Sequence, residues 1–174
     1  MKLHNGLELA VAKAEEDDAD DIIRYLNIVG GESDNLLFGA NGFLISADEE
    51  KKIIRRLKDS AVSALLVGKI DGNIVSVGSV SSDSRERVAH QADVALSVKK
   101  EFWHMGIATE MMKTIVGFAK QNGITEVLHL GVRADNVYAI QLYKKMGFEE
   151  IGLYKKYVKI NGVYQDDLLM NLYL

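Results

Sequence analysis

The sequence predicts a mixed α/β fold, in which helices cover one sheet that contains both parallel and antiparallel neighbours. Two pairs of β-rich runs flank the turn dipeptides Asp71-Gly72 and Asn161-Gly162, which predicts two antiparallel hairpins. Residues 90–132 alternate strand, helix and strand, which predicts a parallel crossover. The full order is β-α-α-β-β-β-α-β-α-β-β, with about seven strands and four helices.

The N-terminal part of this order begins with residues 7–14, whose alternating pattern predicts the first strand. Acidic residues then precede an apolar helical pattern, and because carboxylates complement the positive end of a helix, we expect a first helix that ends near Gly30 and Gly31. An unusually apolar loop follows. Ser46 with Glu49 three residues later is a capping-box pattern and predicts the start of the second helix.

The rest of the chain supplies the remaining strands and two further helices. Glycines end both helices, at Asn122-Gly123 and at Gly147. The predicted elements are the hairpin 64–82, the strand 90–98, the helix 106–121, the strand 125–132, the helix 136–146 and the strands 148–160 and 163–174.

Composition restricts the classes of function. The chain has 174 residues, of which 48% are hydrophobic and 26% charged, so we expect a single globular domain over residues 1–174. A net charge of −4 argues against nucleic-acid binding, which needs an excess of basic residues. The chain has no cysteine, which excludes disulfides, thiolate metal sites and a cysteine nucleophile.

The sequence also predicts where the protein works. It contains no apolar run long enough for a signal peptide or a membrane span, so we expect a cytoplasmic protein without a membrane partner. The lack of cysteine fits a reducing compartment. We expect no metal site.

The stretch WHMGIATEMM at residues 103–112 is the first candidate binding motif. It follows a predicted strand and opens a predicted helix, whose unpaired amides and dipole attract anions. Gly106 and Ala108 keep the backbone accessible, so amides from His104 to Thr109 can converge on a phosphate. The same pattern also fits an ordinary helix start with an apolar core stripe, so the motif alone decides neither reading.

The second candidate motif is NVYAIQLYKKMGF at residues 136–148. Asn136 and Tyr143 are seven residues apart and share one stripe of the helix. A tyrosine there can donate a proton to a leaving group of comparable basicity. It can equally be a half-buried aromatic side chain.

Together the two motifs resemble the GNAT superfamily of acyl-CoA-dependent N-acyltransferases. The order of strands and helices agrees with that family over nearly the whole chain. The sequence departs from it at Trp103, where the family usually has Gln or Arg. The matching residues are Gly106, Ile107, Ala108, Asn136, Ala139, Leu142, Tyr143, Gly147 and Phe148.

The resemblance implies a fold, a cofactor and a chemistry. Two central parallel strands would splay apart and admit the pantetheine arm of acetyl-CoA, while the helix start would hold its pyrophosphate. Tyr143 would protonate the leaving thiolate, after direct attack of an amine on the thioester. The residues assigned to the cofactor are Leu96, Ser97, Val98, His104, Met105, Gly106, Ile107, Ala108, Thr109, Asn136, Ala139 and Tyr143.

An attacking amine must also lose a proton, so a base is needed. Asp93, beside the cofactor gap, is the first candidate, acting through a water, and Glu32 in the apolar loop is the second. His90 and Tyr138 are weaker candidates. Asp93 could instead be an outward-facing strand carboxylate, and Glu32 a loop residue without a catalytic part.

The sequence therefore predicts an acetyl-CoA-dependent N-acetyltransferase whose acceptor is a primary amine of a small molecule or peptide. A non-catalytic acyl-CoA sensor with the same fold is the alternative, and a domain that serves only protein contacts is a third. The resemblance also implies a homodimer.

Overall fold

The computed structural model describes residues 1–3 and 6–174 of the chain. Within these residues the chain forms a seven-stranded mixed sheet and four α-helices, which confirms the predicted α/β fold. The helices are α1 (Ala19–Val29), α2 (Ala47–Lys58), α3 (Ile107–Gln121) and α4 (Val137–Lys145), with 3₁₀ turns η1 (Glu16–Asp18) and η2 (Lys100–Phe102). The strands are β1 (Ala10–Lys13), β2 (Ala64–Ile70), β3 (Asn73–Ser82), β4 (Gln91–Val98), β5 (Val127–Arg133), β6 (Glu149–Ile160) and β7 (Val163–Tyr173).

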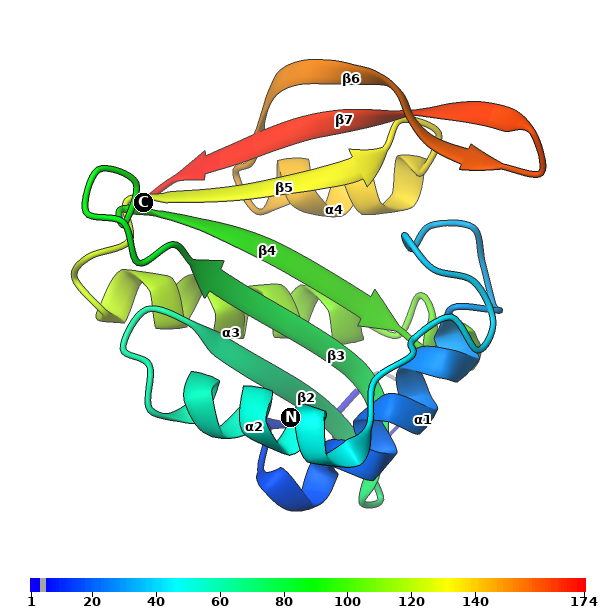
Figure 1. Cartoon of the computed structure of the whole chain (residues 1–174), viewed down its shortest axis with the longest axis vertical. Coiled ribbons are helices and arrows are strands. Elements are labelled where there is room, and N and C mark those ends of the chain that lie inside the picture. Colours follow the sequence, from blue (N-terminus) through cyan, green and yellow to red (C-terminus); the bar gives the residue numbers. More distant parts are fainter. Residues whose placement is uncertain (4–5) are drawn as a thin grey trace.

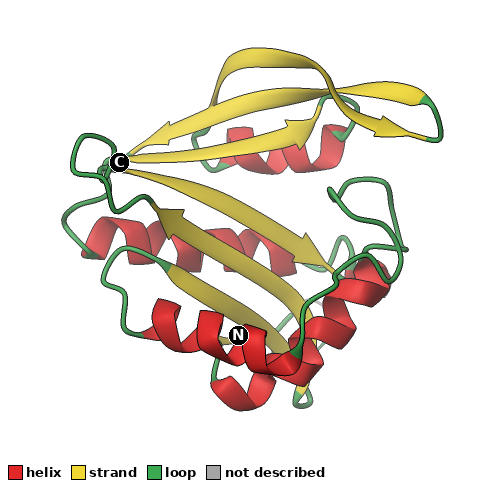
Figure 2. Ribbon diagram, viewed as in Figure 1, coloured by secondary structure: helices red, strands yellow, loops and turns green. Residues whose placement is uncertain are grey.

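The sheet runs in the order β1-β2-β3-β4-β5-β7-β6, with helices on both faces of its first half. Figure 1 shows α1 and α2 in front of β2 and β3, with α3 behind them and α4 behind β5 and β7. Figure 2 shows the same arrangement by type of element. Two apolar clusters hold these layers together. The larger lies between α3 and the sheet around Met111 and Ile115, and the smaller lies beneath α1 around Ile22.

Both predicted hairpin turns are present. Asp71 and Gly72 have φ values of 48° and 80°, and Asn161 and Gly162 have 48° and 84°. Positive φ at both central residues is what a type I′ turn requires, and it matches the twist of the flanking strands.

The predicted helix caps are also present. The Ser46 hydroxyl accepts a hydrogen bond from the amide of Glu49, whose carboxylate accepts one from the amide of Ser46. At α4, the Asn136 side chain accepts from the amide of Ala139. Helix α3 begins directly after Gly106.

Two predicted boundaries shift because side chains engage the backbone locally. The acidic run forms η1 before α1 begins, and there Asp18 accepts from the amide of Glu15 and pairs with Lys69 on β2. After α3, the side chain of Asn122 accepts from the amide of Thr125 at 2.8 Å, so β5 begins at Val127 rather than at Thr125.

The feature that creates the site is the divergence of β4 and β5. They pair in parallel through three residue pairs, from Gln91 with Val127 to Asp93 with His129. Beyond these pairs the two strands separate, as Figure 1 shows, while β4 stays paired with β3 as far as Val98. The predicted splay of the two central parallel strands is confirmed.

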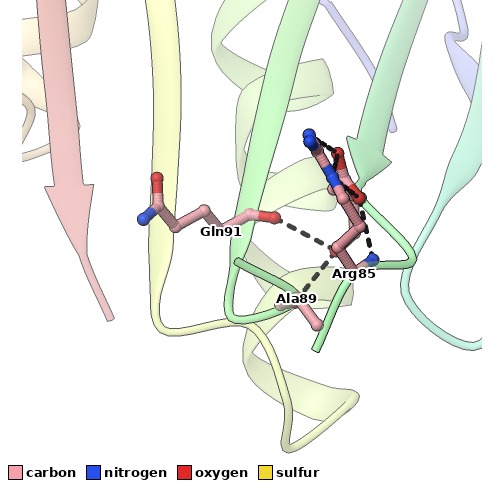
Figure 3. A network of polar contacts seen from close by, with 5 residues as sticks. Arg85, Ala89 and Gln91 are labelled. Carbon is pink, nitrogen blue, oxygen red and sulfur yellow. Dashed lines mark hydrogen bonds and ion pairs between the residues drawn. The ribbon is translucent and has the colours of Figure 1, made fainter. Parts of the chain in front are cut away.

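The loop that leads into β4 is anchored where the two strands are still together. The hydroxyl of Ser82 donates to the carbonyls of Ala89 and Gln91 at 2.9 and 3.0 Å (Figure 3). In the same loop Arg85 forms an ion pair with Asp83. The closed end of the gap is therefore held in place by side chains as well as by strand pairing.

None of the helices formed by the described residues has the length and apolar character that a membrane span needs.

Candidate active site

A cavity of about 1130 Å³ opens where β4 and β5 separate. Its walls come from both strands, the start of α3, the inner side of α4 and the loop between α1 and α2. The predicted site residues line it, except for Met105 and the weaker candidate base His90. Residues that are up to 111 positions apart in the sequence, from Glu32 to Tyr143, therefore meet around one space.

The start of α3 forms one end of this cavity. Gly106 has a φ of 86° and His104 a φ of 62°, both in the left-handed region. Such a backbone turns consecutive amides towards one side, where they can bind an anion. A Cβ at Gly106 would meet no described protein atom within 4 Å, so the space above the helix start is open. The start of α3 therefore has the open backbone that the predicted anion site needs.

Trp103, the departure from the family pattern, packs onto the cavity wall. Its indole Nε1 donates to the carbonyl of Val98 at 2.7 Å, and the ammonium of Lys100 lies 5.8 Å from the ring centroid. The indole thus fixes the turn between β4 and α3, instead of offering a polar head group as Gln or Arg would.

Along β4, the backbone N–H and C=O groups of successive residues point alternately towards β3 and towards the gap. The amide of Lys99 donates to Val75 and the carbonyl of Ser97 accepts from the Ser76 hydroxyl, so the backbone of odd-numbered residues is turned towards β3. The even-numbered residues Leu96 and Val98 therefore present their backbone to the gap. The Ser97 side chain lies on the cavity wall, where it accepts from the buried hydroxyl of Tyr25 at 3.1 Å.

Tyr143 projects from α4 into the same cavity. Its ring contacts that of Phe148 with a centroid distance of 5.8 Å, and burial raises the pKa of the phenol to about 12. Among the described residues its hydroxyl has no hydrogen-bond partner. The phenol is therefore protonated at neutral pH, with its O–H available to a ligand.

The two predicted bases lie in different surroundings. Asp93 is exposed, and its carboxylate makes no contact with another described side chain within hydrogen-bond distance. Glu32 instead accepts from the amide of Lys100 at 2.7 Å, and so ties the α1–α2 loop to η2. The same loop is tied to β5, because Arg133 donates to the carbonyl of Asp34 at 2.9 Å. The loop therefore crosses the mouth of the gap and is fixed on both sides.

The structure adds residues to the site that sequence reasoning missed. His129 on β5 lies beside Asp93, and its Nδ1 is 2.8 Å from Oδ1 of Asn171. Asp167 on β7 lies in register with Arg133 and is only 8% exposed. Burial raises the pKa of the Asp167 carboxyl, although Arg133 opposes the shift. The final strand also holds Gln165, Asp166 and Asn171, so no local pattern marked Asp167 as a site residue.

A mixed sheet with two splayed parallel strands, a helix start that can bind an anion and a buried phenol in the gap define an acyltransferase of the acyl-CoA type. The cavity joins the start of α3 to an open sheet face, as transfer from a long nucleotide thioester to a second substrate requires.

Comparison with known families identifies the family to which the chain belongs. Residues 34–148 match the family described as Acetyltransferase (GNAT) family, and the chain belongs to that family. The predicted family and enzyme class are thereby confirmed: the chain is an N-acetyltransferase by family.

Individual relatives agree with this assignment. The chain is 34% identical over 115 residues to the L-amino acid N-acetyltransferase AaaT of Escherichia coli, covering 66% of this chain and 71% of the relative. A GNAT-family acetyltransferase from Streptococcus pneumoniae superimposes with a TM-score of 0.94 at 27% identity, over 96% of this chain and 100% of the other. The fold is also shared with yncA from Salmonella typhimurium, solved with its cofactor acetyl-CoA, with a TM-score of 0.84 at 15% identity over 96% and 94% of the two chains.

Proposed function

We propose that this protein transfers the acetyl group of acetyl-CoA to a primary amine by direct attack within a ternary complex. The observation that carries the proposal is the gap between β4 and β5, which opens from the anion site at α3 onto the far face of the sheet. One substrate can enter from each side. The chain has no cysteine that could form a covalent acyl intermediate, which agrees with direct transfer.

The cofactor would lie with its pyrophosphate on the amides of His104, Met105, Gly106, Ile107, Ala108 and Thr109. The positive φ at Gly106 and the open space above it support this placement. Asn136 and Ala139, which line the cavity at the start of α4, would contact the cofactor beside it. The bound cofactor supplies the thioester, and these residues hold it.

The pantetheine arm would pair with the gap-facing backbone of β4. Leu96 offers both its amide and its carbonyl, whereas the Val98 carbonyl already accepts from Trp103. The arm would therefore pair with Leu96 and the Val98 amide, and Ser97 would contribute its side of the wall. Of the three predicted residues Leu96, Ser97 and Val98, we therefore propose only Leu96 and Val98 for backbone pairing.

Tyr143 would be the group that donates a proton to the departing thiolate. Its pKa of about 12 means that the phenol carries its proton at neutral pH. A thiol has an ordinary pKa near about 8.5, below that of the phenol, so the O–H would first donate a strong hydrogen bond to the developing negative charge. The proton would then pass to the sulfur as solvent reprotonates the phenol. Its lack of another partner among the described residues supports this role.

The base would be Asp93 rather than Glu32. The carboxylate of Glu32 is already engaged by the Lys100 amide, so its charge stabilises the loop. Asp93 lies at the closed end of the gap, on the face that an acceptor would approach, and it is open to water. A water between Asp93 and the reacting nitrogen would carry the proton away.

The acceptor would be the α-amine of an amino acid or a short peptide, and the name of the Escherichia coli relative supports this class. We further propose a cytoplasmic location, which the absence of cysteine supports. A homodimer through the edge strand β6 is supported by its exposed apolar side chains, which include Ile151 and Leu153.

Two measurements test the function. Acetyl-CoA should raise the melting temperature, because a ligand at about 100 times its dissociation constant stabilises by about 2.7 kcal/mol. Thiol release should then depend on an added amine. The absence of any shift with millimolar acetyl-CoA would reject the cofactor, and a shift without thiol release across a broad amine panel would favour the sensor.

A further inference from the structure

The open face of the sheet carries one buried carboxylate that the proposed mechanism does not use. Asp167 lies on β7 among residues that alternate between the two faces of the sheet. Its neighbours Leu168 and Met170 pair with Val132 and Leu130 on the face covered by α3 and α4. Asp167 therefore points to the opposite face, where it lines the cavity.

The residues around Asp167 leave its charge without a direct partner. Its carboxylate makes no hydrogen bond or ion pair with any residue that the structure describes. Arg133 lies in register with it, but that guanidinium donates to both carboxylate oxygens of Asp135 and to the carbonyl of Asp34. Asp167 as a residue is 8% exposed, and its carboxylate oxygens remain accessible from the cavity, where a ligand could donate hydrogen bonds to them.

The backbone of β5 makes room for this carboxylate. A Cβ at Gly131 would lie 2.5 Å from Oδ2 of Asp167, far inside contact distance. Any side chain at position 131 would therefore displace the carboxylate. Gly131 lies on β5 beyond the last pair with β4, so the space that Asp167 occupies is beside the open gap.

We infer that Asp167 binds the acceptor amine as an ammonium ion and takes its first proton. The inference rests on the proposed function and names the group that receives the second substrate. The acceptor class is a primary ammonium. Its three N–H donors lie on one compact cation, which matches a single carboxylate.

An incoming ammonium must lose two protons, and we assign them to Asp167 and Asp93, two of the carboxylates that line the cavity. Asp167 takes one, which leaves a neutral amine whose nitrogen attacks the thioester carbonyl carbon. The C–S bond then breaks, and the thiolate receives a proton from Tyr143, which solvent reprotonates. The second nitrogen proton leaves through water to Asp93. The products are an N-acetylated amine and free CoA thiol, with one net proton released.

The burial of Asp167 supports its assignment as the acceptor of the first proton. A buried carboxyl with a raised pKa is a better proton acceptor near neutral pH than an exposed one. The other ionisable groups facing Asp167 are Arg133 on β5 and Tyr154 on β6, which are its register partners. Across the cavity lie His129 and Asp93, on β5 and β4.

The test compares Asp167→Asn with Asp93→Asn and the wild type, using thiol release with L-methionine, L-alanyl-L-alanine, tyramine and spermidine. Asp167→Asn should lower kcat/KM for the amine by about 10²–10³-fold, while the dissociation constant of acetyl-CoA changes less than twofold. Its deficit should shrink as the pH rises from 7 to 10, because more of the amine is then already neutral. Asp93→Asn should lose less.

A glycine pair provides the second line of the test. Gly131→Ala should also lower kcat/KM, because its Cβ displaces the Asp167 carboxylate. Gly152→Ala, whose added Cβ meets nothing described within 4 Å, is the matched control and should be silent. This pair decides the question if Asp167→Asn fails to fold.

The inference is overturned if Asp167→Asn keeps kcat/KM within twofold of the wild type, or if its deficit is the same at every pH and Gly131→Ala behaves like Gly152→Ala. A wild-type enzyme that binds acetyl-CoA but releases no thiol with these amines would overturn the proposed function, and this inference with it.

Discussion

The two halves of the sheet are covered very differently. Strands β2 and β3 are sandwiched between α1 and α2 on one face and α3 on the other, and β2 is largely buried. Strands β5 and β7 have α4 behind them, and β6 is exposed along most of its length. In the proposed function, the first half and the start of α3 would hold one substrate, while the second half would leave a face open for another.

The difference follows from what each half must hold. A phosphate bound by backbone amides needs those amides to stay in one arrangement, which dense packing beneath α3 provides. An acceptor that enters and leaves needs an accessible face and a few polar groups, which β5 and β7 provide. Four substitutions, in order of decreasing expected effect, test this comparison.

Gly106→Val should abolish acetyl-CoA binding, with an increase in the dissociation constant of at least about 10³-fold. A branched side chain is strained at a φ of 86°, and it would project into the open space above the helix start. Isothermal titration measures the effect. Gly117→Val within the same helix is the control, and unchanged affinity of the Gly106 variant would contradict the anion site.

Met111→Ala should lower the free energy of unfolding by about 3 kcal/mol. The Met111 side chain is 0% exposed, and its sulfur and methyl lie against β2 and β3 at Gly68 and Gly78. On the open half, Leu153→Ala on β6 should cost under about 0.5 kcal/mol, since Leu153 is 48% exposed. Denaturant unfolding compares the two variants, and equal losses would contradict the difference in packing between the halves.

Tyr143→Phe should lower kcat by about 10²-fold and leave acetyl-CoA affinity nearly unchanged. The substitution removes only the hydroxyl, and the ring contact with Phe148 stays. Steady-state kinetics with a thermal-shift titration separates the two effects. The control is Tyr173→Phe at the exposed end of β7. A parallel loss of binding and turnover would mean that Tyr143 has a packing role.

Trp103→Phe should have the smallest effect. It removes one hydrogen bond to the Val98 carbonyl, worth about 1 kcal/mol, and keeps an aromatic ring in the turn. We expect a melting temperature a few degrees lower and a change of less than about fivefold in acetyl-CoA affinity. A large loss of affinity would show that the indole itself contacts the cofactor.

Local signals accounted for most of the fold. The turn residues Asp71-Gly72 and Asn161-Gly162, the Ser46 capping box and the Asn136 cap each act within a few positions of the chain, so a reading of neighbouring residues finds them. Strand ends were less well predicted, because side chains such as Asn122 redirect the backbone just before a strand begins.

The candidates for cofactor binding were found where residues belong to a local motif. The helix start at Gly106 and the stripe with Tyr143 were found in the sequence, and both line the cavity. Glu32 was found as a candidate, but its bond to the Lys100 amide joins positions far apart and has no local signal. His129 and Asp167 were missed for the same reason.

The sequence by itself determined the order of elements, both hairpin turns, the helix caps and the family, because these depend on residues a few positions apart. Only the tertiary structure decided where β4 and β5 separate, and that the Trp103 indole donates a hydrogen bond to the Val98 carbonyl. It also decided that Asp167 lies buried over Gly131. Each of these depends on how distant strands meet, and burial is a property that a side chain acquires only when the sheet has formed.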